Sequence, residues 1–158
     1  MTQATDAALS IYQANLGTPE GTGDWYEMTQ ETINGFADLT HDHQFIHVDP
    51  EACKTMSPWG VPIAHGFLTL SMLTHLVGSV PQDPERVKGA VMGVNYGFDK
   101  VRFVSPVKVN SRIRATSVLS AVEQKGDALQ VTRTVTVEIE GEDKPALVAD
   151  WVTRIVFG

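Results

Sequence analysis

The chain has 158 residues, a length that fits one domain with its own hydrophobic core. Its 19 acidic residues outnumber 12 basic ones, and the formal net charge of −7 argues against a nucleic-acid partner. The one cysteine, Cys53, excludes an intrachain disulfide and a multi-cysteine zinc site, and is expected to be a buried small apolar residue. No apolar run reaches the roughly 18 residues that cross a bilayer, and the N-terminus lacks a secretory signal pattern. These features predict a cytoplasmic protein without a membrane partner.

The N-terminal part of the chain predicts two helices separated by a loop and a short strand. Residues 6–16 carry a loosely helical apolar pattern, and residues 18–24 form a loop without periodicity. Residues 25–29 read as a short strand. Thr29 is the expected N-cap of a helix that runs to about Leu39, because Gln30 and Glu31 provide the first-turn chemistry that such caps prefer.

The remainder of the chain predicts one buried helix and a series of strands. Residues 63–77, "IAHGFLTLSMLTHLV", are apolar nearly all round, which is typical of a buried helix. Four later segments carry β-branched and aromatic residues or alternate with period two: residues 90–103, 111–124, 128–141 and 146–157. Turn-like "QKGD" and "EGEDKP" separate the last three, so they are expected to be antiparallel neighbours. The pattern predicts an α+β fold in which the sheet lies around the helix.

A polar stretch at residues 36–54, "FADLTHDHQFIHVDPEACK", holds three of the five histidines. Three imidazoles are a known zinc set, so a metal site built from His41, His43 and His47 is one interpretation. A water-holding pair is another, since the carboxylate of Asp42 accepts a proton while the imidazole of His47 holds or donates one. A polar turn without chemistry is the third. On an extended backbone His41 and His43 point away from Asp42, which favours solvated or structural roles for both.

Three segments of the chain, in order, resemble the MaoC-like dehydratases, also called hydratase 2 or (R)-specific enoyl-CoA hydratases. The Asp42 to His47 spacing matches the family's Gly-Asp-x-Asn-Pro-Leu/Ile-His motif, and "IAHGFLTLSMLTHLVG" and "NYGFDKVRFVSPVKVNSRIRA" match its central helix and strand-turn-strand signature. The "DHQFIH" variant is similar to the nodulation protein N-like subgroup. The resemblance covers Trp25 to Val156. It implies one hot-dog domain over residues 1–158, an antiparallel sheet wrapped around a long central helix, with residues 1–24 as an N-terminal helix and loop extension.

The resemblance also implies roles for individual residues. Asp42 is expected to be the base and His47 the general acid, while the backbone N–H of Gly66 forms the oxyanion hole. The other residues that it places near the substrate are His65, Thr74 and Phe45. Thr74 is expected to support Asp42 or the bound water, and His65 to orient the start of the helix.

Two positions depart from the family motif. His41 replaces the glycine before the catalytic aspartate, and a histidine fits less well than glycine wherever φ is positive. Gln44 and Phe45 replace the Asn-Pro pair, which changes the pocket wall.

The function that the resemblance implies is water addition to trans-2-enoyl thioesters to give (R)-3-hydroxyacyl thioesters, without cofactor or metal. The acyl carrier is coenzyme A or a carrier protein. Two alternatives stay open. A hot-dog thioesterase usually has a carboxylate on the central helix, and residues 63–77 contain none. A non-catalytic acyl-CoA-binding module is supported by His41 at the glycine position.

Relatives of this kind place the substrate along a dimer interface. We therefore expect a homodimer in which the apolar strand at residues 88–103 pairs across a two-fold axis. Lys100 and Arg102 on this strand are candidates for contact with coenzyme phosphates, although solvated roles suit them equally.

Overall fold

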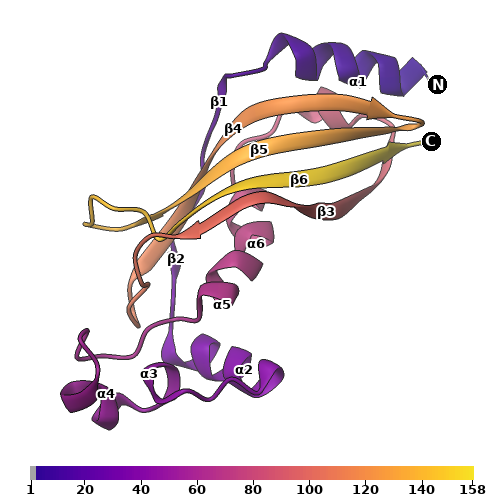
Figure 1. Ribbon diagram of the computed structural model, residues 1–158. Helices are drawn as coiled ribbons and strands as arrows, with labels where there is room; N and C mark the ends of the chain where they lie inside the picture. The colour runs from indigo at the N-terminus through magenta and orange to yellow at the C-terminus, as the bar shows by residue number, and fades with distance from the viewer. Residues whose placement is uncertain (1–2) are drawn as a thin grey trace.

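The computed structural model describes residues 3–158, so residues 1 and 2 of the predicted extension lie outside the described part (Figure 1). The helices are α1 (Gln3–Ala14), α2 (Gln30–Thr40), α3 (Phe45–Val48), α4 (Pro50–Met56), α5 (Gly66–Ser71), α6 (Leu73–Gly78) and the 3-10 helix η1 (Pro84–Val87). The strands are β1 (Pro19–Thr22), β2 (Tyr26–Glu27), β3 (Ala90–Phe103), β4 (Arg112–Lys125), β5 (Ala128–Ile139) and β6 (Leu147–Phe157). Among the described residues, no helix is long and apolar enough to cross a membrane.

The strands form one antiparallel sheet in the order β1-β4-β5-β6-β3, and β2 also pairs with β4. All four long strands predicted from the sequence are present, and the α+β prediction is confirmed. In β5 every second side chain is buried, from Leu129 to Ile139, as the period-two pattern indicates. β3 lies last in the sheet order, which leaves one of its edges unpaired within the described chain.

The central helix packs on the concave face of the sheet, but it is shorter than predicted and has two parts (Figure 1). Its expected start at residue 63 is wrong. Ile63 forms an antiparallel bridge with Lys108, and the Ala64 N–H donates to the Val107 carbonyl at 2.7 Å, so this segment is extended until Gly66 begins α5. Met72 separates α5 from α6, although its N–H still donates to the Leu68 carbonyl at 2.9 Å.

Two hydrophobic clusters lie on the same face of the sheet. Side chains of α5 and α6 pack against one half of the long strands, and Ala8 and Tyr12 of α1 pack against the other half. Each fully buried aliphatic side chain contributes on the order of 1.5–3 kcal/mol to folding. Arg133 of β5 lies between the clusters, where it donates to the Glu20 carboxylate at 2.9 Å. Buried charges therefore separate the two cores.

Glu20 comes from β1, where the sequence predicts a loop. That prediction is wrong because "PEGT" pairs with the edge of β4, with Thr22 opposite Thr116. The strand has no β-branched or aromatic run of its own, so its conformation is set by the hydrogen-bonding edge that β4 offers it.

The polar stretch forms a separate layer of short helices, α2, α3 and α4, at one end of the sheet (Figure 1). Thr29 caps α2 by accepting from the Thr32 N–H, which confirms the predicted cap. Ile33 and Ala37 of α2 are fully buried, so this helix anchors the layer to the main core. α4 begins with Asp49 as N-cap and Pro50 in the first turn, a start signal present in the sequence.

Candidate active site

The site begins where α2 ends. His41 has φ 60° and ψ 22°, the left-handed conformation that ends many helices and that glycine adopts most readily. A non-glycine residue there costs about 1–3 kcal/mol, which surrounding structure has to offset. His41, which replaces the glycine of the family motif, therefore lies at a backbone position where φ is positive. The turn at His41 redirects the chain so that Asp42 and α3 lie over the start of α5.

His47 lies on α3, and one of its ring nitrogens is engaged in a hydrogen bond. Its side chain is buried, and Nδ1 lies 2.7 Å from the Ile63 carbonyl oxygen, which can only accept, so Nδ1 carries a hydrogen. The His47 backbone carbonyl accepts from the Gln30 side-chain amide at 2.8 Å. These two bonds fix the ring between α2 and the segment before α5, and leave Nε2 as the nitrogen available for chemistry.

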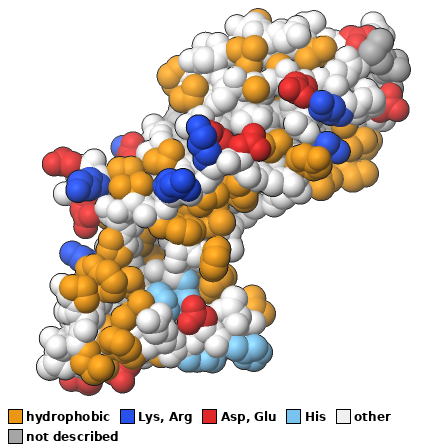
Figure 2. Space-filling model, viewed as in Figure 1, with side chains coloured by type: hydrophobic (Ala, Val, Ile, Leu, Met, Phe, Trp, Pro, Cys, Tyr) orange, Lys and Arg blue, Asp and Glu red, His pale blue; other side chains and the backbone are white. Residues whose placement is uncertain are grey.

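His65 joins the two residues of the predicted pair. Its Nε2 donates to the Asp42 backbone carbonyl at 3.0 Å, and its ring stacks on the His47 ring with centroids 3.7 Å apart and planes 24° apart. One potential ligand atom from each of Asp42, His47 and His65 lies within 4.8 Å of the others. Figure 2 shows histidine side chains beside an acidic one in the lower part of the molecule.

The Asp42 carboxylate is exposed and weakly held. Within the described residues it accepts one long bond, 3.4 Å, from the Gln44 N–H. It therefore has lone pairs free to accept from a water molecule, next to a buried imidazole.

Burial lowers the pKa of His47 below its ordinary value of 6.5, and the neighbouring His65 lowers it further. The hydrogen bond with the Ile63 carbonyl and the charge of Asp42 act in the opposite direction but do not cancel the effect of burial. At neutral pH His47 is therefore an uncharged imidazole whose Nε2 accepts a hydrogen bond.

The geometry does not favour a metal. His41 and His43 are exposed, and His43 Nε2 lies 2.8 Å from the Asp38 carboxylate, so the three-histidine set considered from the sequence does not converge. The set that does converge contains two stacked rings. A metal ion lies close to the plane of each imidazole that binds it, and a stack with centroids 3.7 Å apart and planes 24° apart does not favour one ion in the plane of both rings.

A pocket of about 270 Å³ adjoins the start of α5. Its wall includes Ile63, whose carbonyl holds His47, together with Gly66, Thr69 and Phe103. A Cβ on Gly66 would lie 3.1 Å from the Phe103 ring, tighter than ordinary contact, so only glycine leaves this wall unobstructed. As the first residue of α5, Gly66 has an N–H without an intrahelical acceptor.

Thr74 and Phe45 are two other residues that the resemblance places near the substrate. Thr74 is exposed on α6 and donates to the Ser71 carbonyl at 3.3 Å, with no bond to Asp42. Phe45 is half-buried at the start of α3. The threonine in the pocket wall is Thr69, which sequence reasoning missed even though its spacing of three from Gly66 places both on one helix face.

Cys53 is buried as predicted. Burial, with the charge of Asp49, raises the pKa of its thiol, so this group is no nucleophile.

An antiparallel sheet packed on a short central helix, with an acid and a histidine on an overlying segment, defines a hot-dog protein of the hydratase type. The family model described as "MaoC like domain" matches residues 12–141, and this chain belongs to that family. The 3-hydroxyacyl-thioester dehydratase Z of Mycobacterium tuberculosis is 49% identical over 153 residues, which cover 96% of this chain and 98% of that protein. Nodulation protein N of Rhizobium leguminosarum bv. viciae is 47% identical over 154 residues, 96% of this chain and 93% of that protein.

The fold agrees with solved structures. A MaoC-like dehydratase from Rhodospirillum rubrum matches with a TM-score of 0.71, covering 90% of this chain and 93% of that chain at 17% identity. The predicted family and the hot-dog fold are confirmed. The relatives support a lyase of the hydratase or dehydratase type that acts on acyl thioesters.

Proposed function

We propose that the chain adds water to trans-2-enoyl thioesters, with enoyl-CoA as substrate, and produces (R)-3-hydroxyacyl thioesters. The observation that carries this proposal is the gathering of Asp42, His47 and His65 within 4.8 Å at the start of the helix that presents Gly66. A water-activating pair then lies close to a pocket whose wall includes Gly66, the residue that offers the N–H donor, and Ile63, whose carbonyl holds His47. Those are the parts that conjugate addition of water to a thioester requires.

The tautomer of His47 suggests an order of proton transfers. A water held by the Asp42 carboxylate and by Nε2 of His47 attacks the β-carbon and gives its proton to Nε2, since Nδ1 already carries a hydrogen. The imidazolium then returns that proton to the α-carbon, so that H and OH add across the double bond. His47 thus acts as the base of the first step and as the general acid of the second. The acid role is the one that the resemblance implies, whereas the base role that the resemblance gives to Asp42 passes to His47 in this order of steps. Asp42 orients the water and stabilises the imidazolium.

The thioester oxygen becomes negative between these steps. We assign its stabilisation to the Gly66 N–H, at a position where a Cβ would lie 3.1 Å from the Phe103 ring in the pocket wall. The pocket of about 270 Å³ beside Gly66 then receives part of the acyl thioester. Because Asp42 and His47 belong to one segment, they act on one face of the substrate, and syn addition follows.

The alternatives have less support. Neither α5 nor α6 contains Asp or Glu, so the helix lacks the carboxylate of a hot-dog thioesterase. His41 adopts the left-handed conformation expected of the glycine that it replaces, which removes the main argument for a non-catalytic binding module.

One assay separates these functions. Purified protein is mixed with crotonyl-CoA while the enoyl absorbance and free thiol are both followed, and the product is analysed for chirality. We expect loss of absorbance without thiol release, and an (R)-3-hydroxy product. Thiol release with an intact double bond would indicate a thioesterase, and binding with neither change would indicate an acyl-binding module. A series of acyl lengths, on coenzyme A and on a carrier protein, then defines the substrate.

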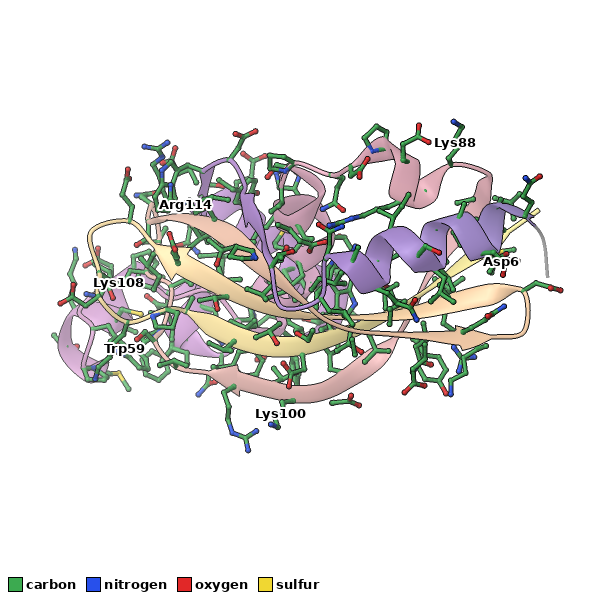
Figure 3. All side chains as sticks on the ribbon, turned by 90° about the horizontal axis from the view of Figure 1, so that it is seen from above. Asp6, Trp59, Lys88, Lys100, Lys108 and Arg114 are labelled. Carbon is green, nitrogen blue, oxygen red and sulfur yellow. The ribbon has the colours of Figure 1, made fainter. Side chains whose placement is uncertain are left out.

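We further propose a homodimer formed along β3. Six large apolar side chains of this edge strand are each more than a third exposed: Val91, Met92, Val94, Tyr96, Phe98 and Phe103. Pairing two copies of the strand would cover them and satisfy its free edge. Lys100 projects away from the sheet (Figure 3), and Arg102 is also exposed, so both stay candidates for contact with coenzyme phosphates.

The dimer prediction is tested by sedimentation together with activity. We expect a dimer at micromolar concentration, with an interface above about 2,000 Å² in total, and activity that falls as the dimer dissociates. A fully active monomer would refute it. The division into one domain with residues 1–24 as an extension, and the cytoplasmic location, stay predictions.

A further inference from the structure

His65 contacts both members of the proposed pair and directly precedes Gly66. Its Nε2 donates to the Asp42 carbonyl, its ring stacks on His47, and it precedes Gly66 as the N-cap residue of α5. His65 is 3% exposed, and the Phe36 ring also contacts it, with centroids 5.0 Å apart and planes tilted by 55°. Through these contacts His65 fixes Asp42 and His47 relative to the start of α5.

The segment that carries Asp42 has few other ties to the helix start. His41, Asp42, His43 and Gln44 are all exposed, and the side-chain bonds of this stretch are local: His43 to Asp38, and the Gln44 N–H to the Asp42 carboxylate. The bond from His65 spans 23 residues of sequence and links the segment directly to α5. Without it, Asp42 follows a left-handed turn whose strain favours rearrangement.

We propose that His65 is a positioning residue for water addition: by donating to the Asp42 carbonyl while stacking on His47, it holds the two at the separation that one water bridges. The proposal rests on the proposed function, because it assigns His65 no chemistry of its own. Its Nε2 is occupied by the Asp42 carbonyl, and its Nδ1 is buried without a partner among the described residues.

His65 also acts on the charge state of His47. It lowers the pKa of His47, in the same direction as burial and opposite to Asp42 and the Ile63 carbonyl. The stacked imidazole thus favours the neutral form of His47 that accepts the proton of water.

The test compares two amides that differ in reach. The side-chain nitrogen of glutamine reaches the position of Nε2, whereas that of asparagine reaches only as far as Nδ1. His65→Gln and His65→Asn both remove the stacked ring, but only glutamine keeps the donor to the Asp42 carbonyl. Misplacement of a catalytic group by about 1 Å costs up to roughly 100-fold in rate. We therefore expect His65→Asn to lower kcat by about 10- to 100-fold with little change in KM, and His65→Gln to recover most of that loss.

A second measurement asks whether the effect passes through Asp42. In an Asp42→Asn background, replacing His65 by Asn is expected to lower kcat by less than about threefold further, since residues that act as a unit are not additive. Melting temperatures of all variants are recorded, and an effect on stability alone would leave kcat of folded protein unchanged. Equal kcat for His65→Gln and His65→Asn, or full additivity with Asp42→Asn, would overturn the proposal.

The two proposals fail differently. If the wild-type protein does not hydrate crotonyl-CoA, the proposed function is wrong. If Asp42→Asn is inactive while His65→Asn is as active as His65→Gln, only the role of His65 is wrong.

Discussion

Two carboxylates in this protein have opposite surroundings. The Glu20 side chain is 1% exposed and is bonded to three partners: Arg86 at 2.6 Å, Arg133 at 2.9 Å and the Ser117 hydroxyl at 2.7 Å. The Asp42 carboxylate is exposed and accepts one bond of 3.4 Å from the protein, within the described residues. Glu20, with its three partners, lies on β1, whereas the candidate site lies around α3 and the start of α5 (Figure 1).

The difference follows from what each group has to do. A buried charge without partners costs several kcal/mol, so Glu20 is retained only because its lone pairs are satisfied. A group that activates water needs free lone pairs, and Asp42 keeps them by lying at the surface beside a buried imidazole. We therefore expect substitutions at Glu20 and Asp42 to affect different properties.

The largest effect is expected for the catalytic pair. Asp42→Asn and His47→Ala should each lower kcat by about 10²- to 10⁴-fold, the usual worth of a positioned acid or base. The free energy of unfolding should change by less than about 1 kcal/mol in Asp42→Asn, since the exposed carboxylate makes so few contacts. Steady-state hydration kinetics and urea unfolding measure the two quantities. Retention of more than about a tenth of wild-type activity in either variant would exclude the pair.

Glu20→Gln is expected to lower the free energy of unfolding strongly and to leave kcat almost unchanged. Arg86 and Arg133 would then be buried without a counter-charge, which costs about 3–5 kcal/mol in the free energy of unfolding. kcat of the folded enzyme should stay within about twofold of wild type. Glu140→Gln provides the control, because Glu140 pairs with Arg112 at 3.0 Å but both side chains are 47% exposed. Exposed pairs contribute about 0–1 kcal/mol, and urea unfolding of both variants decides whether burial makes the difference.

The long strands could be predicted from the sequence, whereas the buried ion pairs of Glu20 could not. Strands β4 to β6 follow from alternation, because each side chain's face is set by its own position in the pleat, and β3 follows from its β-branched and aromatic residues. Glu20 was unpredictable as a buried ion, since its strand forms only against the edge of β4 and its partners lie 66 and 113 residues away. Charge patterns do not reveal such distant pairs.

The candidate site was predictable only in part. The Asp42 to His47 spacing was identified through family resemblance, and the structure brings both residues to the same place. The role of His65 depends on a ring stack between two separate segments, which no local pattern shows. Thr74 was carried over by family position, but in this chain its hydroxyl donates to the Ser71 carbonyl at the end of α5.

A smaller effect concerns pH. Because burial lowers the pKa of His47, the imidazole is neutral at pH 7 and gains a proton only below 6.5. A proton on Nε2 prevents it from accepting one from water, so kcat/KM for hydration should be level above pH 6.5 and fall as the pH decreases through the lowered pKa. The folded state binds this proton less readily than the unfolded state, so the free energy of unfolding also decreases as the pH falls from 6.5 through that pKa.

The pH prediction is sharpened by Asp42, whose charge raises the pKa of His47. In Asp42→Asn the His47 resonance, followed by NMR, should titrate at a lower pH than in wild type. A shift to higher pH, or an activity limb above 6.5, would contradict the assignment of His47 as a neutral proton acceptor.

The smallest effect is expected at His43, a histidine from the same segment that is bonded differently. Its ring pairs with Asp38 at the surface, with the two side chains 49% and 77% exposed, so the pair should contribute less than about 1 kcal/mol to stability. His43→Ala should change activity by less than about tenfold, far below the loss for His47→Ala.

A metal chelator should likewise leave hydration unchanged, because the stacked His47 and His65 rings do not favour one shared ion. If chelation abolished activity and zinc restored it, the segment would have to be a metal site after all. Loss in His43→Ala as large as in His47→Ala would argue for the same conclusion, because only a shared ligand would make these two histidines equivalent.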